Sequence, residues 1–412
     1  MTDQALEAHR ALLEEELGET LRVLWEQLTQ IWPLPVVVET MMLLGVGVLS
    51  GAYTPHQVIE RLGLDKHQLY DALGKETPQQ WQCVIQELGY TAFLNEVHRV
   101  LPKSASTRSR ACFAIILDDS LFRRYAKQMA SIFKWWGAAF KAVRKGHDIL
   151  GLMIEIHGRV FILDWVVVSK AGRTRKPRWK YAIEMLREFE HRLKAAAVDP
   201  SMFGVAMDWW YGQKDALVNA ASDIGLIVVS EPAINEIFFV KGQPKTVRQL
   251  KEEFHFQGTW GGYPTERQRA VSKTFGEVIL VLYHEGNICT LLMAKAQKDS
   301  KPDKELRALP VIRIHKQRHW IEQAWRWHKS DLKTGKIQVR KGHKPKAGYT
   351  CRMVTYTILG ALQQQLRKHR HIGRQSIGTI LSWYQRLGSG FKVLGSTLRE
   401  CFSQLHPQFS FG

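Results

Sequence analysis

Two aspartates stand where long apolar segments end. Asp118 follows AIIL and Asp208 follows GVAM, and both segments have the composition of strands buried on two faces. In open α/β sheets, active sites collect at the carboxyl ends of the strands. Two carboxylates in that position repel each other, and they are costly to bury unless they are paired or hold a metal. Because hard oxygen ligands suit Mg²⁺ or Mn²⁺, the pattern predicts a divalent-metal site.

Other interpretations of these aspartates stay open. Strand-end aspartates commonly cap the helix or turn that follows, and each residue could do only that. Asp119 directly follows Asp118, so Asp119 is an alternative to Asp118 as the first ligand.

A third acid lies in the segment 311–332, VIRIHKQRHWIEQAWRWHKSDL, which has the pattern of an amphipathic helix. Its apolar side chains form one stripe, made of Ile314, Ile321, Trp325 and Leu332. Glu322 lies at the border of this stripe, with Arg318 one turn before it, and His315 and Lys329 lie seven residues to either side. Such a helix spans about 20 Å from His315 to Lys329, enough to follow several phosphates of DNA. The alternative is a solvated face with an Arg318–Glu322 pair worth about 0.2–0.5 kcal/mol.

The composition indicates a polyanionic partner. The chain has 412 residues, room for two or three domains, and its 58 Lys and Arg against 39 Asp and Glu give a net charge of +19. An excess of this size is typical of nucleic-acid-binding proteins. The hydrophobic share of 45% excludes a disordered basic tail protein. Five scattered cysteines without a CxxC motif exclude a zinc finger and a disulfide framework.

The first part of the chain, residues 1–105, has helical periodicity. Within it, TPHQVIERLGLDKHQLYDALG (54–74) has the outline of a helix-turn-helix, with Thr54 as N-cap, Pro55 in the first turn and Gly63 in the turn. A second helix over about 66–73 would enter the major groove of DNA. An ordinary helical hairpin is the alternative.

Neither a membrane span nor a signal peptide is expected. The longest apolar run, Val36–Tyr53, could pass for a short span, but it carries Glu39 and three glycines and favours a buried core helix. The N-terminus, MTDQALEAHRALLEEE, is acidic and helix-prone, which argues against a signal peptide and for a cytoplasmic protein.

From residue 111 the pattern is that of an α/β protein. A strand ending at Asp118 precedes a hairpin, DILGLMIEI and VFILDWVVV, that turns at His157-Gly158. A helix over about 179–197, the strand MFGVAMD, a helix over about 213–222 and the strand GLIVVSE follow. We therefore expect a core in two parts, 111–235 and 306–370, interrupted by a β-rich insertion at 236–305 and followed by a helical tail at 371–412.

These motifs together resemble a known family. Asp118-x-Ser120, then Asp208-x-x-Tyr211-Gly212, then a helix with Arg318-x3-Glu322-x6-Lys329 are similar to the DDE transposases of bacterial insertion sequences. The resemblance is to the group with a Tyr-Arg-Glu-Lys signature and a β-rich insertion before the glutamate helix, and it covers about residues 111–370. His315 stands where the signature has tyrosine, so a role specific to the phenol is in doubt.

The resemblance implies an RNase H-like mixed sheet between a helical N-terminal DNA-binding domain and a helical C-terminal region. It implies two Mg²⁺ (or Mn²⁺) ions held by Asp118, Asp208 and Glu322, which would cleave transposon ends and transfer the strands to a target, a route that can pass through hairpin ends. The implied partners are double-stranded DNA and a second copy of the chain in a synaptic homodimer, at the bacterial nucleoid. The alternatives are an RNase H-like endonuclease or resolvase that does not join strands, and a catalytically inactive DNA-binding relative.

The remaining candidates are DNA contacts. Trp260 in GTWGGY, with Tyr263 second, could stack on an unpaired base, although a plain turn aromatic is the alternative. Trp209 and Trp210 are expected in the wall of the site. His315, Arg318 and Lys329 are expected to hold phosphates. Two basic clusters could hold phosphates or be solvated loops: Arg173, Arg175, Lys176 and Arg178, and Arg340, Lys341, Lys344 and Lys346.

Overall fold

The computed structural model describes residues 2–32, 35–64, 66–100, 113–123, 132–137, 142–169, 176–296, 306–336, 344–369, 372 and 375–405. The chain forms two compact units. The first comprises Met1–Ala92, Leu121–Ile149 and Gln323–Gly412, and the second comprises Phe93–Ser120 and Leu150–Glu322. All the carboxylates of the expected metal site belong to the second unit.

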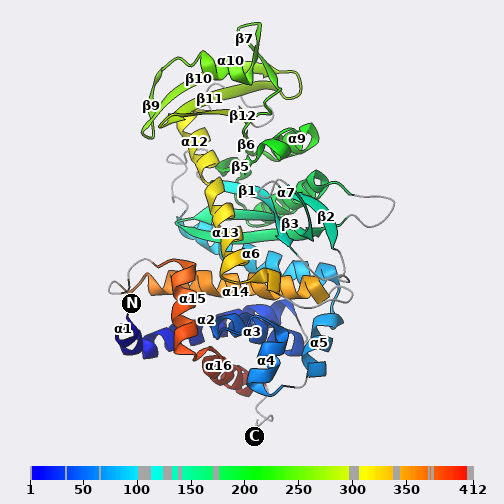
Figure 1. Ribbon diagram of the computed structural model, residues 1–412, viewed down its shortest axis with the longest axis vertical. Helices are drawn as coiled ribbons and strands as arrows, with labels where there is room; N and C mark the ends of the chain where they lie inside the picture. Colours follow the sequence, from blue (N-terminus) through cyan, green and yellow to red (C-terminus); the bar gives the residue numbers. More distant parts are fainter. Residues whose placement is uncertain are drawn as a thin grey trace. The chain divides into compact units, whose positions relative to one another are not determined.

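The first unit is mainly helical and joins the two ends of the sequence in one core. Its helices are α1 (Asp3–Ala8), α2 (Arg10–Ile31), α3 (Pro35–Leu49), α4 (Pro55–Leu62), α5 (Lys66–Lys75), most of α6 (Pro78–Val100), α14 (Lys344–Leu366), α15 (Ile377–Leu387) and α16 (Gly390–Leu405). Helices α14 and α16 both pack against α2 and α3 (Figure 1). The segments expected as an N-terminal domain and a C-terminal tail therefore bury their apolar faces against each other.

The pair α4 and α5 has the local structure that the sequence predicts. The Thr54 side chain accepts a hydrogen bond from the Gln57 backbone, and the Gln57 side chain returns one to the Thr54 backbone. Gly63 ends α4 in the left-handed conformation at φ 63°, where glycine has no side chain to strain. This confirms the two helices and their turn, and DNA binding by α5 stays a prediction.

Helix α3 is part of this core, as its sequence predicts. Val37, Met41 and Val48 are fully buried. Among the described residues, no helix combines the length and the apolar character needed to cross a membrane.

The second unit contains most of a mixed sheet. Strands β1 (Phe113–Arg123), β5 (Phe203–Met207) and β6 (Ile227–Ser230) are adjacent and parallel. Strand β3 (Ala142–Ile156) lies beside β1, and β4 (Arg159–Val168) pairs with β3. The β3–β4 turn falls at His157 and Gly158, as predicted, with φ of 53° and 79°. A short strand that the sequence did not predict, β2 (Phe133–Gly137), pairs with the first residues of β3 in the first unit.

The β-rich insertion extends this sheet. It contains β7 (Ile237–Val240), β8 (Gln243–Thr246), α10 (Val247–Glu252), β9 (Gly258–Trp260), β10 (Tyr263–Ser272), β11 (Gly276–Glu285) and β12 (Ile288–Lys295). Strand β12 runs antiparallel to β6, with Met293 opposite Ser230 and Lys295 opposite Val228. The result is one 12-stranded mixed sheet, which confirms the α/β class.

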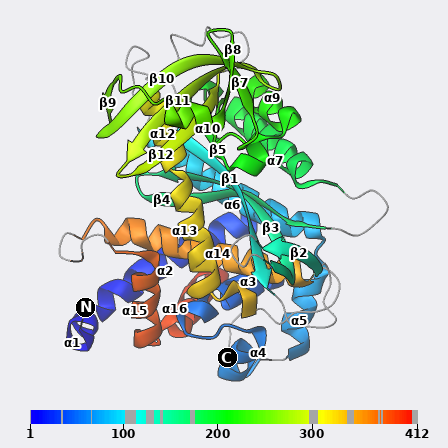
Figure 2. The same ribbon diagram turned by 45° about the horizontal axis from the view of Figure 1, so that its top comes forward.

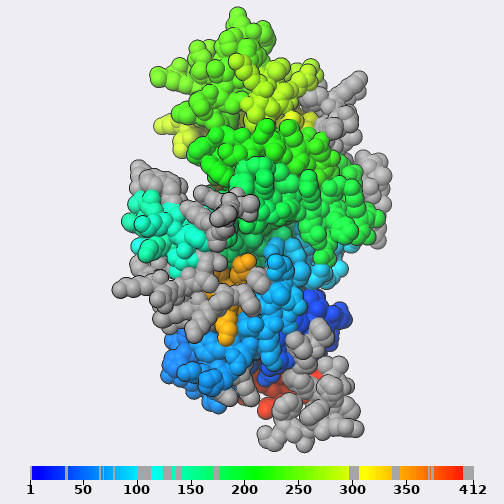
Figure 3. Space-filling model, turned by 90° about the vertical axis from the view of Figure 1, so that its right-hand side faces the viewer, coloured from blue at the N-terminus to red at the C-terminus, as the bar shows by residue number. Residues whose placement is uncertain are grey.

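Helices cover the two faces of the parallel strands. Phe203 on β5 contacts Phe189 of α7 (Arg178–Ala195), and α7 packs on α9 (Asp215–Ile224). Helices α7 and α9 form part of the green surface in Figure 3. Helix α12 (Ala308–Lys316) packs on β5 from the other face (Figure 2). Gly204 and Ala206 of β5 face this helix. Short segments, α8 (Trp209–Gly212) and a 3₁₀ turn (Pro200–Met202), flank β5.

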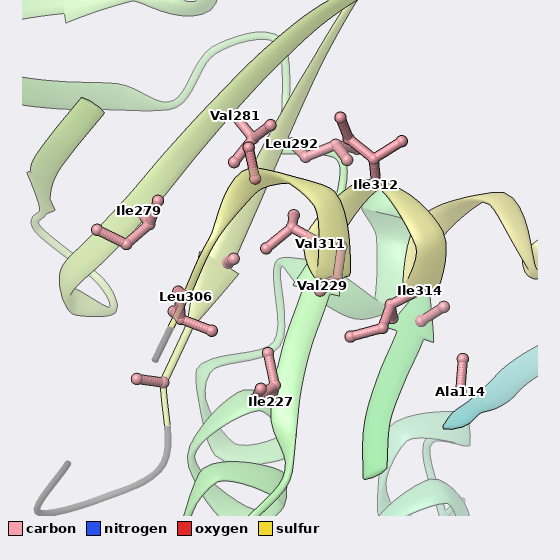
Figure 4. Close-up of a cluster of buried hydrophobic side chains, with 14 of the residues drawn as sticks. Ala114, Ile227, Val229, Ile279, Val281, Leu292, Leu306, Val311, Ile312 and Ile314 are labelled. Atoms are coloured by element: carbon pink, nitrogen blue, oxygen red, sulfur yellow. The ribbon is translucent and has the colours of Figure 1, made fainter. Parts of the chain in front are cut away.

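A buried cluster fixes α12 on the sheet. Val311, Ile312 and Ile314 pack against side chains of β1, β5, β6, β11 and β12 (Figure 4). Because these strands come from both the core and the insertion, α12 is held by both.

The long helix expected over 311–332 is interrupted. Helix α12 ends at Lys316, and α13 (Arg318–Ser330) begins after Gln317. The prediction of one continuous helix was therefore wrong, because the helix is broken at Gln317. A 3₁₀ turn, Thr334–Lys336, follows α13. The four residues of the predicted apolar stripe, Ile314, Ile321, Trp325 and Leu332, are all buried.

The close approach of α12 to β5 gives a first prediction. A Cβ on Gly204 would overlap Ile314 Cδ1 and lie 3.3 Å from the Ile227 carbonyl oxygen. We expect Gly204→Ala to reduce the free energy of unfolding by about 1–3 kcal/mol, as overpacking does. Ile314→Val removes the overlapping atom, so it should restore part of that loss when both changes are combined. Urea unfolding of the two single variants and the double variant measures the coupling.

Gly258→Ala is the matched control, because a Cβ there meets only ordinary contacts of 3.7–4.0 Å with Trp260. Additive losses in the double variant would show that α12 does not depend on this approach.

Candidate functional site

Three acids lie at one level on neighbouring parallel strands. Asp208 and Glu231 directly follow β5 and β6, whereas Asp118 lies within β1, which continues to Arg123, so the prediction of a strand that ends at Asp118 was wrong. Leu117 pairs with Met207, which places Asp118 and Asp208 next in register. Met207 pairs with Ser230, so Glu231 is next on β6. Since side chains alternate along strands, these three acids fall on the side of Gly204 and Ala206, which is the side of α12. We call Asp118, Asp208 and Glu231 the acidic edge.

Glu231 was not among the residues singled out from the sequence. The signal that marks the two aspartates also marks Glu231, because it ends the apolar segment GLIVVSE.

The aspartates of the acidic edge are in an environment that disfavours their charge. Burial raises the pKa of Asp118 well above its ordinary value, and the charges of Asp119 and Asp208 raise it further, while Arg318 opposes them. Burial likewise raises the pKa of Asp208, against hydrogen bonds from the backbone of Tyr211 and Trp210 and the charge of Arg318. A cation placed beside these two carboxylates would therefore be strongly favoured.

Asp208 also caps a helix, as the alternative interpretation predicts. Its Oδ1 accepts a hydrogen bond of 2.9 Å from the Tyr211 backbone nitrogen at the start of α8. The cap holds the Asp208 carboxylate in a fixed orientation, so capping and a place in the acidic edge are compatible.

Asp119 points away from α12. The hydroxyl of Tyr211 donates to Asp119 Oδ1 over 2.8 Å, and Arg178 Nη2 at the start of α7 lies 3.8 Å from Asp119 Oδ2. Since α7 covers the opposite face of the sheet, this geometry favours Asp118 over Asp119 as the β1 acid on the α12 side.

Among the described residues, the Arg318 guanidinium acts on all three acids of the acidic edge. Its charge lowers the pKa of Asp118, Asp208 and Glu231. Its Nη1 lies 3.8 Å from Glu231 Oε1, and its Nη2 lies 4.0 Å from Glu322 Oε1. Both distances exceed those of a hydrogen bond. Its Nε is buried and has no hydrogen-bond partner among the residues that the structure describes.

His315 connects Glu231 to the insertion. Its Nε2 lies 3.3 Å from Glu231 Oε1, and its Nδ1 lies 3.2 Å from the hydroxyl of Tyr283 on β11. If Tyr283 donates to Nδ1, Nε2 carries the proton and donates to Glu231. The signature's tyrosine is absent at position 315, but a phenol is present beside it.

Glu322 lies at the other side of Arg318 and is not buried. Its side chain is 59% exposed, and Arg318 is its ion-pair partner. In the part of the chain that is described, no group of three or more His, Cys, Asp or Glu side chains is arranged to hold a metal ion. The structure thus brings together Asp118, Asp208, His315 and Arg318, and it joins Glu322 to them through Arg318.

The basic candidates differ in their contacts. Lys176 pairs with Glu184 and lies 4.2 Å above the Tyr181 ring, and Arg178 lies 5.7 Å above the Trp210 ring. In the first unit, Lys329 lies 5.7 Å above the Phe122 ring, and Lys344 lies 4.0 Å from Asp71 Oδ1. Arg173, Arg175, Arg340 and Lys341 lie outside the described residues.

The aromatic candidates differ in exposure. Trp260 and Tyr263 pack, partly buried, against the cluster that holds α12. Trp209, directly after Asp208, has 53% of its surface exposed. Its neighbour Trp210 lies under two cations, Arg178 and Lys214. Exposure next to the acidic edge favours Trp209 over Trp260 as a surface for stacking.

No known family model matches the sequence, and no curated protein is significantly similar to it.

The raised pKa of Asp118 predicts a stability that depends on pH. The unfolded chain ionises this carboxyl at a lower pH than the folded protein does, so stability falls as pH rises from the unfolded pKa to the folded pKa. We expect Asp118→Asn to raise the melting temperature at pH 7, by roughly 2 °C per kcal/mol gained. The gain should vanish below about pH 4. Thermal unfolding from pH 3.5 to 8 (about the range of carboxyl titration), with a chelator present, measures it.

Asp215→Asn serves as the control, because Asp215 is exposed in the first turn of α9. A lower melting temperature for Asp118→Asn than for the unchanged protein at pH 7 would show that the site stabilises the Asp118 carboxylate.

Proposed function

We propose that this chain is a DDE-type transposase that binds DNA ends, cleaves them in a metal-dependent reaction and transfers the freed strands. The observation that carries the proposal is the pair Asp118 and Asp208, adjacent in register, both with raised pKa, on the side of the sheet where Arg318 lies. The net charge of +19 supports a nucleic-acid substrate.

The strand order also supports an RNase H-like core. A first strand is followed by a hairpin that lies beside it, and then by two strands, β5 and β6, that are parallel to it on its other side. On this view β7 to β12 are the insertion that separates the two aspartates from the glutamate helix.

Two of the three proposed metal ligands, Asp118 and Asp208, lie together in the described structure, and the third, Glu322, would complete the site. Asp118 and Asp208 are carboxylates whose burial and mutual repulsion a cation would relieve. Glu322, exposed and held only loosely by Arg318, would join them as a third ligand. Two bound Mg²⁺ or Mn²⁺ ions would supply activation of the attacking water or 3′-hydroxyl and stabilisation of the leaving oxygen.

The chain's own residues would orient the DNA. Arg318 has donors that the protein does not satisfy, so we assign it to the phosphates flanking the scissile bond. His315, one turn earlier, would contact the next phosphate, and Lys176, Arg178, Lys329 and Lys344 would hold the backbone further away. The pair α4 and α5 would recognise the end sequence. Two ends must be brought together, so we propose a homodimer.

The test of this function is Glu322→Gln. The change keeps the volume and helix propensity of the side chain and removes one ligand charge, so the fold should be retained. On DNA carrying the sequences that flank the gene, we expect binding within a few-fold of the unchanged protein. Cleavage in Mg²⁺ should fall at least about a hundredfold, equivalent to about 2.7 kcal/mol of barrier. Rates of strand cleavage from end-labelled DNA provide the measurement.

Glu252→Gln on α10, an exposed acid paired with Arg248, is the matched control and should cleave normally. Normal cleavage by Glu322→Gln would mean that the third acid is misassigned. Cleavage by the unchanged protein without joined products would point to the endonuclease or resolvase.

The exposure of Trp209 gives a separate prediction. A fluorescent base analogue placed unpaired at the DNA end should be quenched by the unchanged protein if it stacks on this indole. Trp209→Ala should weaken binding of that DNA by about 5-fold to 150-fold, corresponding to 1–3 kcal/mol of stacking. Its melting temperature should be nearly unchanged. Trp260→Ala should instead lower the melting temperature, since Trp260 packs against the buried cluster.

Trp209→Phe is the conservative control and should keep most of the quenching. If only Trp260→Ala removes the quenching, Trp260 is the stacking residue and Trp209 is a surface residue.

A further inference from the structure

Glu231 has no role in the proposed cleavage reaction, yet it lies beside His315 and Arg318, the two residues assigned to the phosphates nearest the scissile bond. One carboxylate oxygen, Oε1, lies 3.3 Å from His315 Nε2 and 3.8 Å from Arg318 Nη1. A single anionic oxygen thus stands between an imidazole and a guanidinium. A phosphate oxygen would make the same two contacts.

The contacts of Glu231 are loose. Charge-assisted hydrogen bonds are about 2.7–2.9 Å long, shorter than either of these distances. The Glu231 side chain is 45% exposed, whereas the His315 and Arg318 side chains are 13% and 18% exposed. The two donors are therefore largely enclosed by the protein, and the acceptor is the more solvated partner.

Both donors have a reason to stay in place when Glu231 leaves. His315 is fixed on its other side by the Tyr283 hydroxyl, 3.2 Å from Nδ1. Arg318 is attracted to Asp118 and Asp208 as well as to Glu231. Its buried Nε has no acceptor among the described residues.

We propose that Glu231 is an internal competitor for a phosphate-binding site made of His315 and Arg318. In the free protein its carboxylate holds the place of a phosphate group, and a bound phosphate displaces it toward solvent. The identity of that phosphate as part of a DNA end rests on the proposed function. The anion exchange itself rests only on the contacts of these three side chains.

The competition by Glu231 weakens non-specific binding of DNA to the phosphate-binding site. Every phosphodiester that enters the site must displace one carboxylate, so only DNA held by further contacts, such as those of α4 and α5, occupies it fully. Removing the carboxylate charge should strengthen binding of any phosphate, and it should strengthen random duplex at least as much as end DNA.

The experiment compares Glu231→Gln with the unchanged full-length chain in two assays. In the first, inorganic phosphate is titrated while the melting temperature is followed. Glu231→Gln should be stabilised at a several-fold lower phosphate concentration. In the second, binding of random duplex DNA is measured with Asp118→Asn present in both proteins, so that no strand is cut. Glu231→Gln should bind about threefold to tenfold more tightly.

Glu253→Gln is the matched control, because it removes a carboxylate paired with Lys245 on β8, away from α12. It should change neither assay. Without Asp118→Asn, the rate at which Glu231→Gln cleaves end DNA distinguishes a competitor for phosphate from a metal ligand.

Three results would overturn the proposal. Unchanged phosphate and DNA affinity would show that Glu231 does not occupy the site. Weaker binding with the fold intact would show that Glu231 supports His315 and Arg318. Normal binding with loss of cleavage would make Glu231 a metal ligand.

If Glu231→Gln does not fold, Glu231→Asp can replace it, because it withdraws the carboxylate by one methylene. Glu231→Asp should also increase the affinity for phosphate and for random duplex DNA, but by less than expected for Glu231→Gln. If the unchanged protein binds no DNA at all, the proposed function fails, and the phosphate titration still decides the role of Glu231.

Discussion

The site depends on one arginine placed among carboxylates. Asp118 and Asp208 are partly buried like charges that repel each other, and a cation nearby relieves this repulsion. The Arg318 charge acts on both of them and on Glu231, and its guanidinium also reaches Glu322. Arg318 therefore offsets repulsion among acids that come from three strands and a helix.

The position of Arg318 is set by packing rather than by charge. It begins α13 directly after α12, and α12 is fixed through Val311, Ile312 and Ile314 on the sheet. That packing surface includes β5 and β6 of the parallel core and β11 and β12 of the insertion. Because β12 pairs with β6, the insertion continues the sheet that carries the acids. A segment that interrupts the core in sequence thus helps to place the cation that the core needs.

Features encoded locally could be predicted from the sequence. The start of β1, the strand that precedes Asp208, the hairpin turn at His157 and the cap at Thr54 depend on apolar runs and turn residues within a few positions. The end of β1 was not predicted, because the strand continues through polar residues to Arg123. The pairing of β12 with β6 depends on residues far apart in the chain, and no local pattern encodes it. The break at Gln317 lies in HKQRH, which contains neither the proline nor the glycine that commonly mark a helix end.

The site could be predicted only where each residue has a signal of its own. Asp118 and Asp119 are indistinguishable in sequence, and they separate only because alternate strand residues face α12 and α7. Glu231 also follows an apolar segment in the sequence, but its place beside Asp208 depends on the register of β5 with β6.

The histidine at position 315 shows why these residues have to be considered together. A phenol has one oxygen, whereas an imidazole has two nitrogens on different sides of the ring and can join two partners. Here the partners are Tyr283 from the insertion and Glu231 from the end of β6. A histidine in this place therefore requires an acceptor or donor on each side, and the two strands that flank β12 supply them. Both partners of His315 thus come from positions that only the paired sheet brings to α12.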